Sequence, residues 1–186
     1  WFLTELMEST SDEKGKHIRR VAEISALLAK LHPTLSDTDA DTLYHASPMH
    51  DIGKMTVPHE ILHKPGKYTP EEFEVMKSHT TNAYKLLSGS KRKLIKSAAI
   101  IAYQHHEKWD GSGYPRGLKG SDIHIYGRII ALADVFDALT HQRCYKTAWT
   151  VDDAVAFIQE QRGFHFDPEL VDLMISHLDQ FADIVK

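Results

Sequence analysis

Histidine and acidic side chains that could bind metal ions occur in two short segments of this chain. His105 and His106 are adjacent, Glu107 follows them, and a separate His50-Asp51 pair lies upstream. First-row transition metals bind neutral imidazoles and carboxylates together. A glycine-rich segment containing Gly113-Tyr114-Pro115 comes soon after the paired histidines. Core packing does not require this combination, which predicts a metal site beside a ligand-binding loop.

Each further candidate residue is a weak signal by itself. Glu13 and His17 are four residues apart, so on one helix they would project from the same face. Such a pair is more often a surface contact, and Glu13 could instead close a capping box with Thr10. His79 alone is more often a histidine with a structural hydrogen bond than a metal ligand. The prediction of a metal site therefore depends on the residues taken together.

The composition fits one soluble domain with a buried core. The chain has 186 residues, a formal net charge of −4 and 42% hydrophobic residues, and it shows neither a secretory signal nor the run of roughly 18 apolar residues that spans a membrane. The lack of a basic stripe argues against binding to a nucleic-acid polymer. Cys144 is the only cysteine, which suits a reducing cytoplasm. Because the chain begins Trp1-Phe2, we expect residues 1–186 to be one domain excised from a longer protein.

Helix signals dominate and strand signals are scarce, so we expect an all-α domain of about seven helices. Capping residues predict helix starts near residues 10, 36, 69, 150 and 167, and two further helices are expected from about residues 93 and 127. The second helix should reach His50-Asp51 with a kink at Pro48, and the fourth should run to Lys108. Glycines make residues 109–126 a loop. The candidate metal ligands would then be held mainly by helices.

The joint pattern resembles the HD-GYP family, bacterial metal-dependent phosphodiesterases that open cyclic di-GMP. The resemblance extends from about Glu13 to Pro168, with its segments in the family's order. These segments are His50–Lys54, Lys64–Lys67, Met76–His79, His105–Pro115 and Ala133–Leu139. The resemblance implies a single HD-type helical bundle with a Gly-Tyr-Pro loop.

The resemblance also implies a metal-binding set. The implied ligands are His17, His50, Asp51, His79, His105, His106 and Asp134. Asp51 would bridge two ions as a catalytic residue, and Glu13 matches a carboxylate that holds a third ion in similar proteins. Such mixed nitrogen and oxygen donors suit iron or manganese better than one tetrahedral zinc, with nickel or cobalt still open. Two ions could hold a bridging hydroxide that attacks phosphorus.

The residues that the resemblance assigns to the substrate lie around this set. Lys54 would contact the scissile phosphate or the hydroxide, although outside the motif a solvated lysine is the ordinary interpretation. Gly113-Tyr114-Pro115 would form the substrate loop, with the tyrosine stacked on guanine. Arg143 and Lys146 would contact phosphate and guanine. Glu107 is expected to be a hydrogen-bond partner beside the site rather than a ligand.

The implied function is hydrolysis of a 3′,5′-cyclic dinucleotide in the bacterial cytoplasm, with cyclic di-GMP as the first expectation and pGpG or GMP as products. Cys144 stands where the family usually has proline, and residues 124–127 also depart from it, so 3′,3′-cyclic GMP-AMP stays open as substrate. A non-catalytic module that binds the dinucleotide or a diguanylate-cyclase (GGDEF) domain also stays open, as does a mononucleotide phosphohydrolase. A linked sensory or receiver domain is expected in the full-length protein.

Overall fold

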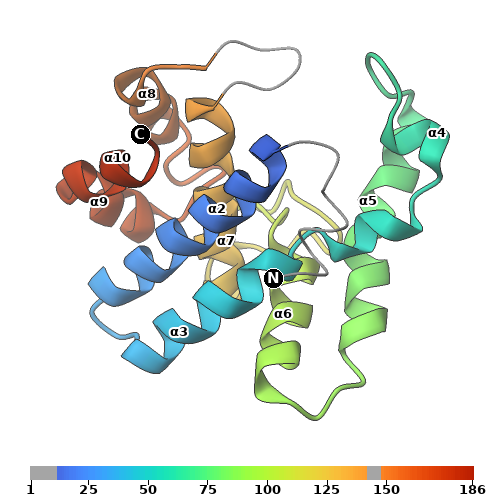
Figure 1. The fold of residues 1–186 in the computed structure, drawn as a ribbon, viewed down its shortest axis with the longest axis horizontal. Coiled ribbons are helices and arrows are strands. Elements are labelled where there is room, and N and C mark those ends of the chain that lie inside the picture. Colours follow the sequence, from blue (N-terminus) through green and yellow to red (C-terminus); the bar gives the residue numbers. More distant parts are fainter. Residues whose placement is uncertain (1–11, 142–147) are drawn as a thin grey trace.

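A computed structural model describes residues 12–141 and 148–186, and within these ranges it contains helices and no strand (Figure 1). The α-helices are α2 (Asp12–Leu31), α3 (Asp37–Ala46), α4 (His59–Leu62), α5 (Pro70–Leu87), α6 (Lys93–Gln104), α7 (Ile125–Thr140), α8 (Val151–Glu160), α9 (Pro168–Ser176) and α10 (Leu178–Ile184). Short 3₁₀ helices are η1 (Ser47–Met49), η2 (Ile52–Thr56) and η3 (Gly120–Asp122). The prediction of an all-α fold is confirmed. None of the described helices is long and apolar enough to cross a membrane.

Side-chain caps begin four helices at the predicted positions. Ser36 and Thr69 each form a capping box with the acid three residues further on. Thr150 and Asp167 accept hydrogen bonds from main-chain N–H groups in the first turns of α8 and α9. Each cap satisfies a donor that the helix itself leaves unpaired. The predicted cap at Thr10 lies outside the described residues.

Three helix boundaries differ from the expectation. The helix α3 ends at Ala46 and is followed by η1 rather than reaching His50-Asp51 with a kink, because Pro48 lies in the tighter 3₁₀ turn. The helix α6 ends at Gln104 rather than Lys108, because the chain turns there and Glu107 hydrogen-bonds to the main chain of the following loop. The helix α7 begins at Ile125, two residues early, where the His124 side chain accepts the N–H of Tyr126. In the described ranges the short α4 and a break at His177 also raise the helix count above seven.

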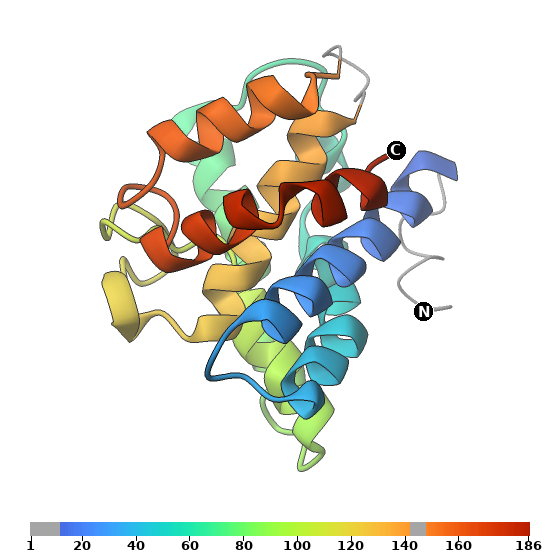
Figure 2. The ribbon, with the colours of Figure 1, turned by 90° about the vertical axis from the view of Figure 1, so that its left-hand side faces the viewer.

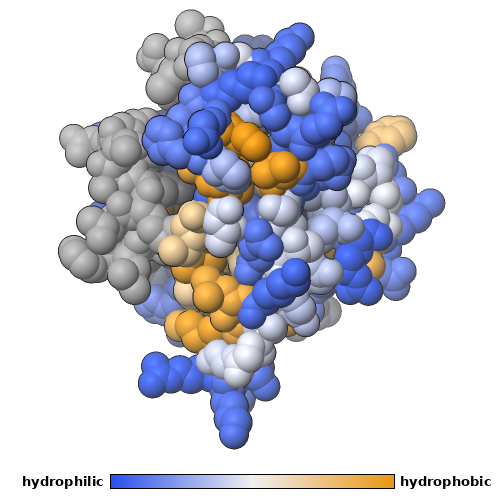
Figure 3. Space-filling model, turned by 90° about the vertical axis from the view of Figure 1, so that its right-hand side faces the viewer, coloured by the Kyte–Doolittle hydropathy of each residue, from blue (hydrophilic) through white to orange (hydrophobic). Residues whose placement is uncertain are grey.

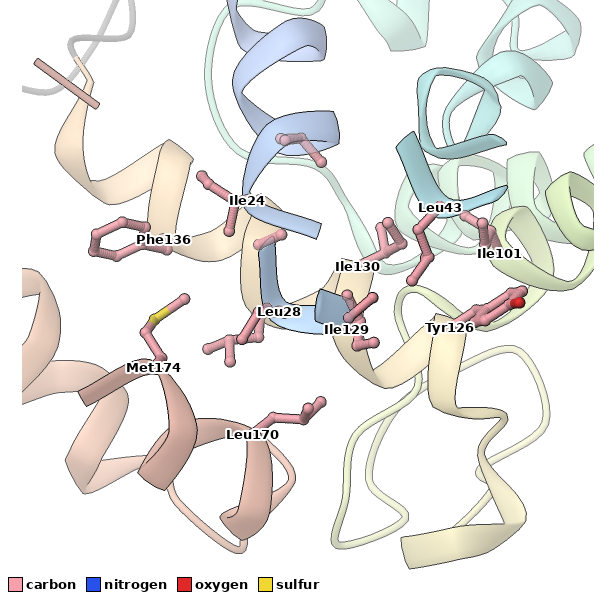
Figure 4. Packing of buried hydrophobic residues seen from close by; sticks show 14 of the residues in the cluster. Ile24, Leu28, Leu43, Ile101, Tyr126, Ile129, Ile130, Phe136, Leu170 and Met174 are labelled. Carbon is pink, nitrogen blue, oxygen red and sulfur yellow. The ribbon is translucent and has the colours of Figure 1, made fainter. Parts of the chain in front are cut away.

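The hydrophobic core lies where α2, α3, α6, α7 and α9 meet. Figure 4 shows the packed side chains, among them Ile24, Leu28, Leu43, Ile101, Ile129, Ile130, Phe136, Leu170 and Met174. Burying one such side chain fully contributes about 1.5–3 kcal/mol. The helices α9 and α10 pack against α2, and α2 packs against α7 (Figure 2). This core therefore holds α2 and α7 side by side, which places their polar faces next to each other.

The helix α5 forms a second unit with α6 and η2, on the right in Figure 1. Gly53 allows η2 to press against α5, because a Cβ atom there would lie 1.9 Å from the carbonyl oxygen of His79. No side chain fits such a space without moving one of the two elements. Gly53 thus brings the segment carrying His50-Asp51 against the helix that carries His79.

Candidate metal centre

Four side chains form a buried group that we call the inner cluster. Asp51, His79, His105 and His106 each place one ligand atom within 4.8 Å of the others. The Oδ1 atom of Asp51 lies 3.5 Å from Nε2 of His79 and 3.6 Å from Nε2 of His105. Asp51 comes from the turn between η1 and η2, His79 from α5, and the paired histidines from the end of α6. Three separate segments thus converge on one point.

A second group, the outer cluster, consists of His17, His50 and Asp134. Nε2 of His17 on α2 lies 3.4 Å from Oδ1 of Asp134 on α7. The Oδ2 atom of Asp51 lies 3.4 Å from Nε2 of His50, so the two oxygens of Asp51 face the two clusters. The structure therefore brings together seven of the eight predicted ligands, and the side chain of the eighth, Glu13, lies outside the described part.

Several buried polar atoms at this centre have no hydrogen-bond partner among the described residues. They are Nε2 of His50, His79 and His105, and Oδ1 of Asp51. Leaving one such atom unsatisfied costs about 1–3 kcal/mol. All four belong to the two clusters, and all are atom types that coordinate transition metals. The residues present therefore fit bound cations.

The opposite ring nitrogens fix the orientation of three of these histidines. Nδ1 of His50 lies 2.8 Å from the carbonyl oxygen of Ser47, and Nδ1 of His79 lies 2.6 Å from that of Met76. Nδ1 of His105 lies 3.1 Å from the carbonyl oxygen of Ala102. A carbonyl can only accept, so each Nδ1 carries a proton, and each ring in its neutral form has its lone pair on Nε2. That is the tautomer a metal ligand needs.

Charge at the centre follows from burial and from Asp51. Burial lowers the pKa of His79 to about 4, and burial together with the neighbouring His105 lowers that of His106, which keeps both rings neutral at pH 7. Burial also opposes a charge on His50, but the Asp51 carboxylate raises its pKa to about 9. Burial alone would raise the pKa of Asp51, yet Lys54 and His50 hold it well below the usual value. A cation between the clusters would compete with the proton on His50.

Lys54 contacts the metal centre through the carboxylate of Asp51. Its ammonium group lies 2.5 Å from Oδ2 of Asp51, three residues earlier, and its side chain is partly exposed. The structure thus places a positive charge at the solvent side of the predicted bridge. A contact between Lys54 and a phosphate group stays a prediction.

The Gly-Tyr-Pro loop is fastened to the inner cluster by its main chain. The buried Glu107 accepts the N–H groups of Arg116 and Leu118 at 2.8 and 2.9 Å, so it orders this loop rather than a histidine. Gly113 approaches so closely that a Cβ atom would lie 2.3 Å from the main-chain nitrogen of Lys108. Tyr114 donates its N–H to the carbonyl oxygen of His106. The loop and the paired histidines therefore form one rigid unit.

The ring of Tyr114 lies over the inner cluster. It stacks on the ring of His106 with the two ring centroids 4.7 Å apart. The ring of Phe73 meets it in a T-shaped contact with the two ring centroids 6.1 Å apart. The ammonium group of Lys77 lies 4.8 Å from the Phe73 ring and 5.6 Å from the Tyr114 ring. Sequence reasoning missed Phe73 and Lys77. The signal available in the sequence was the four-residue spacing between Phe73 and Lys77 on the helix that carries His79.

Hydrophobic side chains gather on the face formed by α4 and α5 (Figure 3). In this region Phe73, Val75 and Leu86 on α5, and Met55 on η2, are large exposed hydrophobic residues. Phe73 and Val75 are two residues apart on α5 and therefore point to opposite sides of that helix, and Phe73 is the one that contacts Tyr114. One exposed aromatic side chain thus lies beside the inner cluster.

Sequence reasoning also missed Asp137. Its carboxylate is buried and accepts hydrogen bonds from Nδ1 of His17 at 2.6 Å and from Nε of Arg20 at 2.5 Å. Although burial alone would raise the pKa of Asp137, these two partners hold it below its usual value. The available signal was the three-residue spacing from Asp134, which places both acids on one face of α7.

Two predicted substrate contacts, Arg143 and Lys146, lie outside the described residues. Their roles remain predictions from the sequence. The other residues of the predicted substrate group, Lys54 and Gly113-Tyr114-Pro115, lie next to the clusters through the contacts described above.

Comparisons with known proteins agree with this architecture. The model of the HD domain family matches residues 2–170. The chain is 47% identical over 182 residues to a Vibrio cholerae protein named 3′3′-cGAMP-specific phosphodiesterase 2, covering 98% of this chain and 35% of that protein. It is 45% identical over 167 residues to the cyclic di-GMP phosphodiesterase response regulator RpfG of Xanthomonas campestris, covering 90% and 44%. The chain thus spans less than half the length of these relatives.

A solved structure shares the fold. It is described as an HDG"Y"P protein from Bdellovibrio bacteriovorus, and it superposes with a TM-score of 0.68 at 19% identity, covering 88% of this chain and 51% of that one. At this identity the likeness concerns the fold alone. Taken with the family model, the relatives and the His-Asp clusters beside a Gly-Tyr-Pro loop, it leads to one assignment. The chain belongs to the HD domain family, and it carries the segments by which it resembles the HD-GYP branch.

Proposed function

We propose that residues 1–186 form one catalytic domain, a metal-dependent phosphodiesterase that hydrolyses a 3′,5′-cyclic dinucleotide. The observation that carries this proposal is the position of Asp51, whose two oxygens face two separate groups of metal-binding side chains. One carboxylate shared between two cation sites is the arrangement of binuclear phosphodiester hydrolases. The names of the relatives support the same class of reaction.

Bound ions would supply Lewis-acid activation of water and stabilisation of charge on the phosphodiester oxygens. The protein's part is to hold the sites and to position the substrate. Asp51 sets the relation between the two clusters, and the carbonyl-bonded histidines keep their lone pairs directed at the sites. Lys54 offers a positive charge beside Asp51, where it would meet the scissile phosphate. The donor set favours iron or manganese, with nickel or cobalt as alternatives.

The substrate would be held by groups outside the ligand set. Gly113-Tyr114-Pro115 would line its pocket, and Arg143 and Lys146 would bind phosphate and guanine. Because His106 already stacks on one face of Tyr114, only the other face of its ring could receive a base. Cyclic di-GMP is the proposed substrate, with pGpG or GMP as product. One relative is named for 3′3′-cGAMP, which keeps the mixed dinucleotide as the alternative.

The proposed setting is the bacterial cytoplasm, in a longer protein with a sensory or receiver domain. The chain spans less than half of its relatives, which leaves room for such a domain. A diguanylate-cyclase domain is a proposed partner, and the Gly-Tyr-Pro loop is the surface that would contact it.

Incubation of the purified chain with Mn²⁺ or Fe²⁺ and each cyclic dinucleotide in parallel tests the proposal. Chromatography should show a linear dinucleotide or mononucleotides, and none with an Asp51→Asn variant. Binding of the dinucleotide without cleavage, at full metal content, would instead favour the non-catalytic module. Cleavage of mononucleotides alone would favour a mononucleotide phosphohydrolase.

A further inference from the structure

Four histidines of the two clusters have a hydrogen-bond partner at Nδ1, and they are held in two chemically different ways. His50, His79 and His105 donate from Nδ1 to main-chain carbonyl groups, which are neutral. His17 instead donates from Nδ1 to the side chain of Asp137 at 2.6 Å. A carboxylate that accepts this proton makes the imidazole a stronger donor than a carbonyl does. The outer cluster therefore has a charged support that no described histidine of the inner cluster has.

The position of Asp137 is set by several hydrogen bonds. Its carboxylate is 1% exposed and receives Nε and Nη2 of Arg20 at 2.5 and 3.2 Å. Nδ1 of His141 also lies 3.2 Å from its Oδ1. Asp134 lies one turn earlier on α7 and faces the other nitrogen of His17 at 3.4 Å. The imidazole on α2 is thus held between two carboxylates of α7.

We propose that Asp137 is a positioning residue that sets the cation affinity of the outer cluster, through the tautomer and donor strength of His17, and leaves the inner cluster unaffected. The inference rests on the proposed function to the extent that both clusters bind cations. It assigns a role to a residue outside the ligand set. It also makes the two metal sites unequal, since only one of them depends on a tertiary carboxylate contact.

Replacement by asparagine has a specific chemical consequence. An amide offers one acceptor oxygen and one NH₂ donor, and Arg20 carries donors only, so it takes the oxygen. The NH₂ group then faces His17 and makes Nδ1 an acceptor, which moves the ring proton to Nε2. The nitrogen that faces Asp134 loses its lone pair. Asp137→Asn should therefore weaken the outer site about 10- to 100-fold.

Asp167→Asn is the matched control. Asp167 is also a buried carboxylate bonded to an arginine, with Nη1 of Arg128 at 2.5 Å, but it caps α9 and touches none of the cluster residues described. A general effect of losing a buried ion pair would appear in both variants. A role through His17 would appear in Asp137→Asn alone.

The experiment is a Mn²⁺ titration of the full chain by equilibrium dialysis with elemental analysis. The wild type and Asp167→Asn should bind the same number of ions tightly, at least two, whereas Asp137→Asn should bind one fewer tightly and one weakly. As many tight ions in Asp137→Asn as in the wild type would overturn the inference. Failure of the wild type to bind Mn²⁺ would instead count against the proposed function.

A second measurement uses the wild type, so it does not depend on whether an Asp137 variant folds. Long-range ¹H–¹⁵N spectra of the metal-free wild type, recorded where histidines are neutral and assigned with His17→Gln, report which nitrogen carries the proton. A proton on Nδ1 of His17 supports the inference. A proton on Nε2 rejects it, whatever the variant does.

Discussion

The inner and outer clusters orient their ligands by different means. His79 and His105 in the inner cluster bond to carbonyl groups three or four residues earlier in the chain, and both side chains are 1% exposed. In the outer cluster, His17 depends on Asp137, which is 120 residues away in the sequence. The side chains of His17 and Asp134 are 15% and 24% exposed. The rings of His79 and His105 are thus oriented by local helix geometry and are closed to solvent, whereas the ring of His17 is oriented by packing between helices in a more open site.

This difference has consequences for exchange and tuning. A histidine held by its own helix main chain keeps its ring orientation as long as that helix persists. A site assembled across α2 and α7 depends on the register of two helices, so small shifts alter it. We expect the outer ion to exchange faster and to respond more to substitutions away from the ligands.

The largest effect should come from replacing Asp51, whose two oxygens face the two clusters. Asp51→Ala removes an oxygen from each site, so it should lose at least one ion and reduce cleavage by at least about 1,000-fold, more than loss of a single oxyanion-stabilising group. Asp134→Ala is the comparison, since it should keep the inner ion. Elemental analysis and turnover, with circular dichroism to verify folding, measure this. Full turnover of Asp51→Ala at wild-type metal content would disprove the shared site.

Gly53→Ala should disturb the inner cluster without touching a ligand. The added Cβ would collide with the carbonyl oxygen of His79 and push η2 away from α5, which should destabilise folding by about 1–3 kcal/mol. Gly89→Ala is the control, because a Cβ at Gly89 meets no atom within 4 Å. Urea denaturation gives the stability and metal titration gives the affinity. Equal behaviour of the two variants would show that the close approach has no effect on the site.

A double replacement of Arg143 and Lys146 by alanine tests residues in neither cluster. If they hold the substrate, metal content stays at the wild-type level while cyclic-dinucleotide hydrolysis falls tenfold or more, since one charge-assisted contact contributes roughly 1.5–3 kcal/mol. Hydrolysis of bis(p-nitrophenyl) phosphate provides the control. An equal loss with this small diester would mean that the two residues do not act as substrate contacts.

The smallest effect is expected for Glu13→Gln. A third cation near His17 would bind the extra phosphate charge of pGpG, so losing it should remove one ion and let pGpG accumulate a few-fold over GMP. Thr10→Ala separates the structural alternative, because it removes the capping partner but keeps the carboxylate. If both variants shift stability slightly and leave the product ratio alone, Glu13 only caps the helix.

The sequence alone predicted the helices and most of the ligand set. Caps such as Ser36 and Thr69 are local, since the acceptor and the donor lie three residues apart. That locality is why the starts of these capped helices were correct. The candidate ligands were named because segments such as His50-Asp51 and His105-His106 follow the order of the family that the chain resembles, and that order gives no information about distance.

Tertiary structure decided how these residues divide into two clusters. Asp51 faces both clusters only because Gly53 lets η2 press against α5, and no spacing in the sequence encodes that approach. The helix end at Gln104 followed from Glu107 binding the main chain of a loop nine and eleven residues later. The hydrogen bond between His17 and Asp137 exists because α7 packs on α2. These features depend on contacts between distant segments, whose free energy exists only once the core has formed.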